Sequence, residues 1–121
     1  MGESKKAKVF LTDRAIRDLQ EIESYTIGKW GEKQAEKYLC AFDRFFTLIE
    51  LEPGILLPIP VVDSLLTHSV ESHIVVCIPW NEDVLVLTII HASRDLLHHL
   101  DRLLPTLKFE VETMKKRLSN P

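Results

Sequence analysis

The chain has 121 residues, of which 45% are apolar and 27% are charged, a composition typical of one compact domain. Its net charge of −3 argues against direct binding to nucleic acid as the main function. The most apolar stretch without proline, residues 84–90, is far shorter than the roughly 20 residues that span a bilayer. Because the polar N-terminus also does not resemble a signal sequence, we expect a cytoplasmic protein with no membrane segment.

The cysteines and glycines give little sign of chemistry. Cys40 and Cys77 both lie within apolar runs, so we expect each to be a buried, reduced thiol rather than half of a disulfide. With only four glycines, the chain has no glycine-rich phosphate loop and no Gly-x-Ser-x-Gly turn. We therefore expect no cofactor, no metal ion and no serine or cysteine nucleophile among the catalytic residue types.

The first half of the sequence predicts one strand and two helices. Residues 6–11 are mostly apolar and lead into Thr12, a residue type that favours a helix N-cap. Apolar side chains then recur every three or four positions, which predicts an amphipathic helix. The glycines Gly28 and Gly31 are expected to end it, and a second amphipathic helix follows over residues 32–52. A short connection predicts an antiparallel helical hairpin.

The second half predicts a loop, three strands and a helical C-terminus. Prolines make residues 53–64 an extended loop. β-Branched residues then predict strands, joined by tight turns, over residues 65–70, 73–80 and 84–91. We expect Ser93 to cap a third helix and Pro105 to divide that helix from a final helical segment.

This order of elements predicts an α+β fold. The first strand is expected at the edge of a mainly antiparallel sheet, with the two-helix hairpin packed on one face. The other face would be left to solvent or to a partner. We expect residues 1–104 to form this domain and residues 105–121 to form a C-terminal helical extension.

The tightest cluster of titratable side chains spans residues 91–101. His91 and Arg94 lie where the last strand ends, a position from which they can face a phosphate or a partner. General acid–base catalysis by a histidine at this position is an open alternative. Asp95 precedes His99 by four residues, a separation that brings two side chains together on a helix. The cluster spreads over nearly half of the helix circumference, which favours a solvated helix face over a metal site.

The segment YTIGKWGEKQAEKYL, residues 25–39, resembles the helix–turn–helix junction of the ParE branch of the ParE/RelE toxin superfamily. A tyrosine, a Trp-Gly pair and an Ala-x-x-Tyr follow in the family's register. The resemblance continues in residues 48–53, in Ser72-His73-Ile74-Val75 and in Ile90-His91-Ala92-Ser93-Arg94-Asp95. We take four residues of these last two motifs as candidate partner-binding residues: His73, His91, Arg94 and Asp95.

The resemblance implies the toxin of a bacterial type II toxin–antitoxin system, of the kind linked to plasmid stabilisation. A cognate antitoxin would hold it inactive by laying a helix or strand into the groove beside the sheet. ParE-type toxins poison DNA gyrase by binding it and are not enzymes, whereas RelE-type toxins cut messenger RNA on the ribosome.

One departure from the family pattern separates these functions. The family usually carries arginines after the second helix, but no Lys or Arg lies between Arg44 and Arg94 here. Because a nuclease needs several cations around the scissile phosphate, this absence weighs most against the RelE-type reaction. A further alternative is a toxin fold that has lost its poison and serves as a binding or oligomeric module.

The C-terminal segment extends beyond the family's usual length. From Leu97 to Leu118 its apolar residues recur at steps of three and four, the spacing of a coiled-coil seam. Such a stripe either folds back onto its own domain, occupying the antitoxin groove, or pairs with a second copy. Because residues of both charges flank the stripe, we expect a homodimer through this helix.

Overall fold

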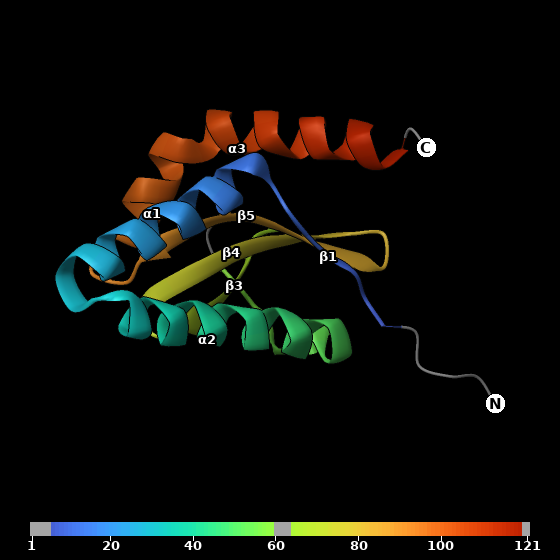
Figure 1. The fold of residues 1–121 in the computed structure, drawn as a ribbon. Coiled ribbons are helices and arrows are strands. Elements are labelled where there is room, and N and C mark those ends of the chain that lie inside the picture. Colours follow the sequence, from blue (N-terminus) through green and yellow to red (C-terminus); the bar gives the residue numbers. More distant parts are fainter. Residues whose placement is uncertain (1–5, 60–63, 120–121) are drawn as a thin grey trace.

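The computed structural model describes residues 6–59 and 64–119. Their elements, in chain order, are β1 (Val9–Leu11), α1 (Asp13–Trp30), α2 (Glu32–Leu51), the 3₁₀ turn η1 (Pro53–Ile55), β2 (Leu57–Pro58), β3 (Leu66–Val70), β4 (His73–Trp80), β5 (Asp83–His91) and α3 (Leu96–Ser119). Figure 1 shows two helices on one side of a sheet and a third helix on the other. The predicted α+β fold is confirmed.

The sheet has five strands in the order β1-β5-β4-β3-β2. Strands β3, β4 and β5 form antiparallel pairs, as the tight turns predict. The segment expected to be an extended loop also contains β2, which pairs antiparallel with β3. The first strand lies at the edge, as expected, but it pairs in parallel with β5, so that Val9 lies opposite Val84. This pair joins two segments that are far apart in the sequence.

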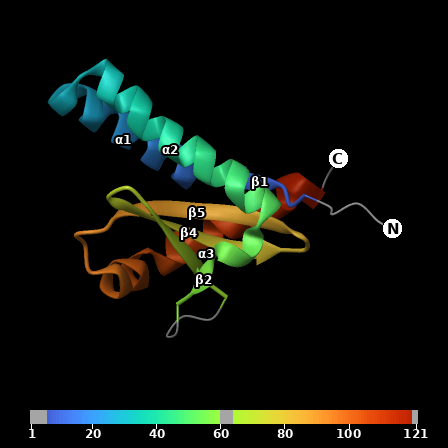
Figure 2. The same cartoon turned by 90° about the horizontal axis from the view of Figure 1, so that it is seen from below.

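The hairpin of α1 and α2 covers one face of the sheet (Figure 2). Of the two glycines expected to end the first helix, only Gly31 does so, with a φ of 91° that favours glycine. Gly28 lies inside α1. The core on this face is apolar and buried, and its members include Ala15, Phe42, Phe45, Ile49, Val75, Cys77 and Val86.

Thr12 fixes the start of α1 on the sheet. Its fully buried hydroxyl accepts a hydrogen bond from the Ala15 amide at 3.1 Å, which is the predicted N-cap contact. The same hydroxyl donates to the Leu87 carbonyl on β5 at 2.9 Å. The Thr12 side chain therefore both caps α1 and links it to β5.

Helix α3 covers the opposite face of the sheet, contrary to the expectation that this face is left to solvent or to a partner (Figures 1 and 2). Leu100, Leu107 and Met114 are buried there against strand residues that include Leu85 and Leu87. Most of the stripe that suggested a homodimer is thus covered by the chain's own sheet, although Leu97 stays exposed. The physical reason is that the face of β4 and β5 opposite the helical hairpin is itself apolar. Packing α3 against this face removes both apolar surfaces from water.

Pro105 does not divide this helix in two, contrary to our prediction. Helix α3 continues through Pro105 and across the expected boundary between residues 104 and 105. Figure 1 shows its first turns standing at an angle to the rest, as a proline within a helix produces. Pro105 is exposed, so the carbonyl that it leaves unpaired in the preceding turn can bind water.

The end of α3 is tied to the start of α1. The Arg117 guanidinium donates two hydrogen bonds to the Asp13 carboxylate, at 2.7 and 3.0 Å. These hydrogen bonds from Arg117 lower the pKa of Asp13. Because both side chains are exposed, the pair orients the helix rather than supplying much stability.

The two cysteines differ in a way that the sequence does not show. Cys77 is buried, and burial raises the pKa of its thiol to about 12, whereas Cys40 is exposed on α2. The expectation of a buried thiol is therefore wrong for Cys40. In the described part of the chain, no helix is both long and apolar enough to cross a membrane.

Candidate functional site

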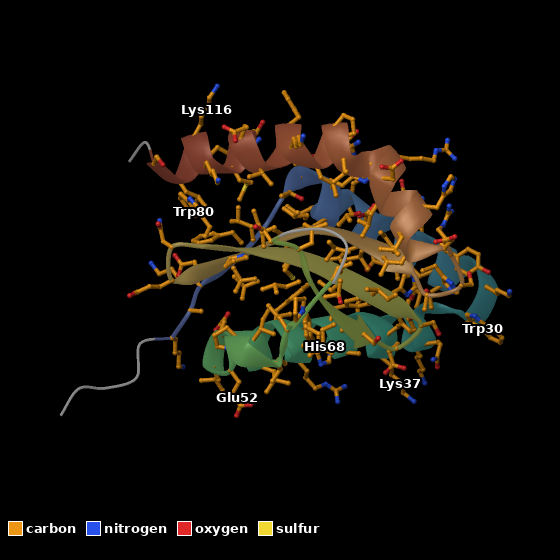
Figure 3. The ribbon with its side chains drawn as sticks, turned by 180° about the vertical axis from the view of Figure 1, so that it is seen from behind. Trp30, Lys37, Glu52, His68, Trp80 and Lys116 are labelled. Atoms are coloured by element: carbon orange, nitrogen blue, oxygen red, sulfur yellow. The ribbon has the colours of Figure 1, made fainter. Side chains whose placement is uncertain are left out.

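An open groove of about 1120 Å³ lies between α1 and the ends of β4 and β5. One wall is α1 from Arg14 to Trp30, and the other is formed by β5 and the turn into α3. Figure 3 shows Trp30 at the tip of the helical hairpin, at one end of this groove. The groove brings together three of the four candidate residues: His73 from β4, His91 from the end of β5 and Arg94 from the turn that follows.

A β-bulge sets the direction of the histidine on β5. Leu87 is an extra residue relative to β4, so the alternation of side chains reverses there. Val86 faces the hairpin before the bulge, and Ile89 faces it after the bulge. His91 consequently shares this face with His73, with the two ring centres 5.0 Å apart and the rings edge to face.

Asp18 on α1 accepts hydrogen bonds from a backbone amide and a side-chain hydroxyl next to the bulge. Its Oδ2 accepts hydrogen bonds from the Ile89 amide at 3.0 Å and from the Thr88 hydroxyl at 2.5 Å. The Nε of Arg14 lies 3.5 Å from Oδ1 of Asp18. Burial raises the pKa of Asp18, although both hydrogen bonds act in the opposite direction. Asp18 therefore has a structural role that also orients Arg14.

Tyr38 on α2 orients the ring of His73. Its hydroxyl oxygen accepts a hydrogen bond from the Ser72 amide at 3.0 Å, and the hydroxyl lies 2.7 Å from Nδ1 of His73. The tautomer of His73 sets which of these two groups donates the second hydrogen bond. Burial, together with the nearby His91, lowers the pKa of His73 to about 4. His73 is thus a neutral, oriented ring at neutral pH.

The turn after β5 is built around His91. Nδ1 of His91 accepts a hydrogen bond from the Ser93 amide at 3.0 Å and lies 2.7 Å from the Ser93 hydroxyl. Ser93 is therefore not the cap of α3, contrary to our prediction. Asp95 caps the helix instead, because its Oδ1 accepts a hydrogen bond from the His98 amide at 3.2 Å.

Two arginines and a histidine gather at the end of the groove where α3 begins. Arg14 of α1, Arg94 of the turn and His99 of α3 line it together. Desolvation lowers the pKa of His99, and so do Arg94, Arg14 and Arg102, while Asp18 acts against them. Burial and the nearby arginines therefore disfavour the charged form of the His99 ring, so the positive charge that lines this end of the groove comes from Arg14 and Arg94.

The opposite end of the groove, at the hairpin tip, is aromatic and exposed. Tyr25 and Trp30 are 64% and 66% exposed, high values for large apolar side chains. The Lys29 ammonium lies 5.5 Å from the centre of the Tyr25 ring and 5.8 Å from that of Trp30. A partner that covers this tip would bury both aromatic rings.

Comparison with known proteins assigns the family. The profile of a family described as the ParE toxin of the type II toxin–antitoxin system parDE matches residues 9–96, well over half of the chain. The chain belongs to the ParE toxin family. A search of the curated proteins finds no significant match.

A solved structure supports the ParE fold. It is titled as the chromosomal ParDE toxin–antitoxin system from P. aeruginosa, and one of its chains is 16% identical with a TM-score of 0.65. The alignment covers 74% of this chain and 100% of that chain. Because the ParE profile ends at residue 96, where α3 begins, nearly all of α3 lies beyond the matched residues.

The structure also shows which site residues of this ParE-family chain the sequence did not reveal. Asp95, the fourth candidate, caps α3 and is absent from the residues that line the groove. Tyr38, Arg14 and Asp18 were not predicted at all. The Ala-x-x-Tyr motif of the junction was a signal for Tyr38. No sequence pattern predicts the bulge in β5, beside which Asp18 accepts its hydrogen bonds. Among the described residues, no group of three His, Cys, Asp or Glu side chains is placed to hold a metal ion.

Proposed function

We propose that this ParE-family toxin acts by binding other proteins. A cognate antitoxin neutralises it by occupying the groove between α1 and β5, and its target is DNA gyrase. The expected location is the cytoplasm, where such a target would be met.

The observation that carries this proposal is the exposed aromatic tip of the groove. Tyr25 and Trp30 leave most of their surface open to solvent, and they lie at one end of the groove, which is large enough for a peptide segment. Aromatic residues are enriched where protein partners bind tightly, because their burial supplies much of the binding energy. An antitoxin that covers the tip would gain this energy without a strong dependence on charge.

The distribution of cations favours binding over catalysis. Because no Lys or Arg lies between Arg44 and Arg94, strands β2 to β5 contribute no permanent positive charge. The arginines that line the groove, Arg14 and Arg94, stand at the end where α3 begins, and Arg14 is partly paired with Asp18. Such a site is poorly suited to the dispersed negative charge of a phosphoryl transition state.

The first test is expression of the chain in bacteria, with and without the protein encoded next to its gene. We expect growth arrest that the neighbouring protein relieves. Trp30→Ala should weaken binding of that protein by at least about tenfold, as for a buried aromatic anchor. Leu57→Ala is the matched control, because Leu57 is 63% exposed but lies on β2, outside the groove.

The second test identifies the target. Purified chain should inhibit supercoiling by gyrase and should leave messenger RNA intact on ribosomes. Ribosome-dependent cleavage would instead show the RelE-type reaction, with the histidine pair and Arg94 as its candidates. Antitoxin binding without any growth arrest would identify a toxin fold that has lost its poison.

A further inference from the structure

A second groove, the outer hairpin groove, lies between α1 and α2 and has a volume of about 430 Å³. It opens on the side of the hairpin that faces away from the sheet (Figure 2). On α2, Phe42 and Ile49 are buried toward the sheet. Cys40 and Asp43, which line this groove, are exposed. Among the described residues, none lines both this groove and the one between α1 and β5, so the hairpin carries two separate surfaces.

The floor of the outer hairpin groove is apolar. Ala35 is buried there, Leu39 is half-buried and Ile27 is 40% exposed. Packing an apolar side chain on Ile27 and Leu39 removes their surface from water, which favours binding. A shallow channel along two antiparallel helices fits the apolar face of a third helix, a common mode of peptide recognition. The shape therefore favours an amphipathic helix as the occupant.

The rim of this groove is acidic and is not neutralised. The carboxylates that line it are those of Glu23, Glu32, Glu36 and Asp43. In the part of the chain that the structure describes, no Lys, Arg or His side chain lines the groove, and no ion pair joins any of these carboxylates to a described residue. Glu32 lies in the first turn of α2, where the helix dipole favours a negative charge. Glu36 follows four residues later and repels it, so a cationic partner would relieve this repulsion.

The charge of the rim selects the class of occupant. It repels the phosphates of nucleic acid and the headgroups of anionic lipids. A second copy of the chain is also disfavoured, because a symmetric interface would bring the same acidic rim against itself. A helix that carries Lys or Arg beside its apolar face is complementary to both the floor and the rim of the groove.

We propose that the outer hairpin groove binds a basic amphipathic helix of the target, DNA gyrase. The apolar face of that helix packs on Ile27 and Leu39, and its basic side chains pair with Glu36 and Asp43. This inference rests on the proposed function, since it names the chemistry of the target segment. The two grooves meet at the hairpin tip, where Ile27 of this groove directly precedes Gly28 in α1, and an antitoxin that covers the tip would therefore obstruct the target.

The test measures binding of purified gyrase to the full chain and to two double variants of equal net charge. Glu36→Gln combined with Asp43→Asn removes two charges of the rim and should weaken gyrase binding at least about tenfold. Asp101→Asn combined with Glu112→Gln removes two exposed charges of α3, outside both grooves, and should change the affinity by less than about twofold. Both variants should bind the protein encoded next to the gene like wild type, because that partner occupies the other groove.

Salt and a native thiol give two further readouts. Added salt should weaken gyrase binding of the wild type more than that of the rim variant, because salt screens the rim. Cys40 lines the groove and is exposed, whereas Cys77 is buried, so a maleimide should modify Cys40 selectively. Bound gyrase should slow this modification, followed by mass spectrometry of the chain, far more than the protein encoded next to the gene does.

The outcomes separate the two proposals. If gyrase binds the chain but binds the rim variant equally well, this inference is wrong and the proposed function stands. If the rim variant loses affinity for both partners, the groove is not specific to the target and the inference is also wrong. If the chain does not bind gyrase, the proposed target and the inference are both wrong.

Discussion

Acidification should destabilise the fold through His73, and replacing this residue by glutamine tests the prediction. His73 is half-buried against Tyr38, Phe42 and His91, which lowers its pKa from 6.5 to about 4. Between these two pH values the unfolded chain binds a proton that the folded chain does not. Stability is therefore retained above about pH 6.5 and is lost as the pH falls toward 4.

The size of this effect follows from the two pKa values. A fall from 6.5 to about 4 corresponds to about 3 kcal/mol if it acts in full. Because the ring is only half-buried, solvent screening reduces the expected loss to roughly 1–2 kcal/mol. A glutamine side chain at this position would keep an acceptor for Tyr38 but does not titrate, so His73→Gln should lack this part of the pH dependence.

Urea unfolding of both proteins, measured at a series of pH values from about 7 to about 4, gives the free energy of unfolding of each. The difference between wild type and His73→Gln cancels the contribution of the carboxylates that both share. We expect this difference to change by roughly 1–2 kcal/mol across the series. Parallel profiles would refute the reasoning, because His73 would then titrate alike in the folded and unfolded chains.

Other substitutions test the remaining contacts. Thr12→Val should cost about 2 kcal/mol in urea unfolding, because it removes the helix cap and a buried hydrogen bond while keeping the side-chain shape; a loss below about 0.5 kcal/mol would contradict this role. Leu107→Ala should cost about 2–4 kcal/mol and lower the thermal midpoint, whereas an unchanged midpoint would mean that α3 does not pack on the sheet. Arg117→Gln should leave the urea midpoint nearly unchanged, since its pair with Asp13 is exposed. Finally, the chain should show no ribosome-dependent RNA cleavage; robust cleavage that Arg94→Ala abolishes would disprove this.

The helices and strands were predictable because their signals are local. Apolar periodicity fixed α1 and α2 to within a few residues, and Thr12 announced the start of α1. The direction of His91 was not predictable, because it depends on an extra residue in β5 that has meaning only relative to the register of β4. Three candidate residues of the groove came from sequence motifs, but their convergence required the bulge.

The placement of α3 shows a different limit of sequence reasoning. Its stripe, which includes Leu100 and Leu107, signals that the helix must be covered, but the spacing is the same whether the cover is a second copy or the chain's own sheet. The alternate residues of β4 and β5 on the outer face, such as Val76 and Leu85, are apolar too. Two apolar surfaces in one chain meet at a lower entropic cost than two surfaces on separate molecules, so the helix folds back.

The parallel pairing of β1 with β5 has a consequence for how the chain is made. Val9 cannot pair with Val84 until the ribosome has synthesised the first residues of β5, so the sheet stays unfinished for most of translation. The groove has α1 as one wall and β5 as the other, and it therefore does not exist on a nascent or truncated chain that stops before β5. An interrupted round of synthesis therefore yields a fragment without the groove, so any binding that depends on the groove comes only from chains translated past the last strand.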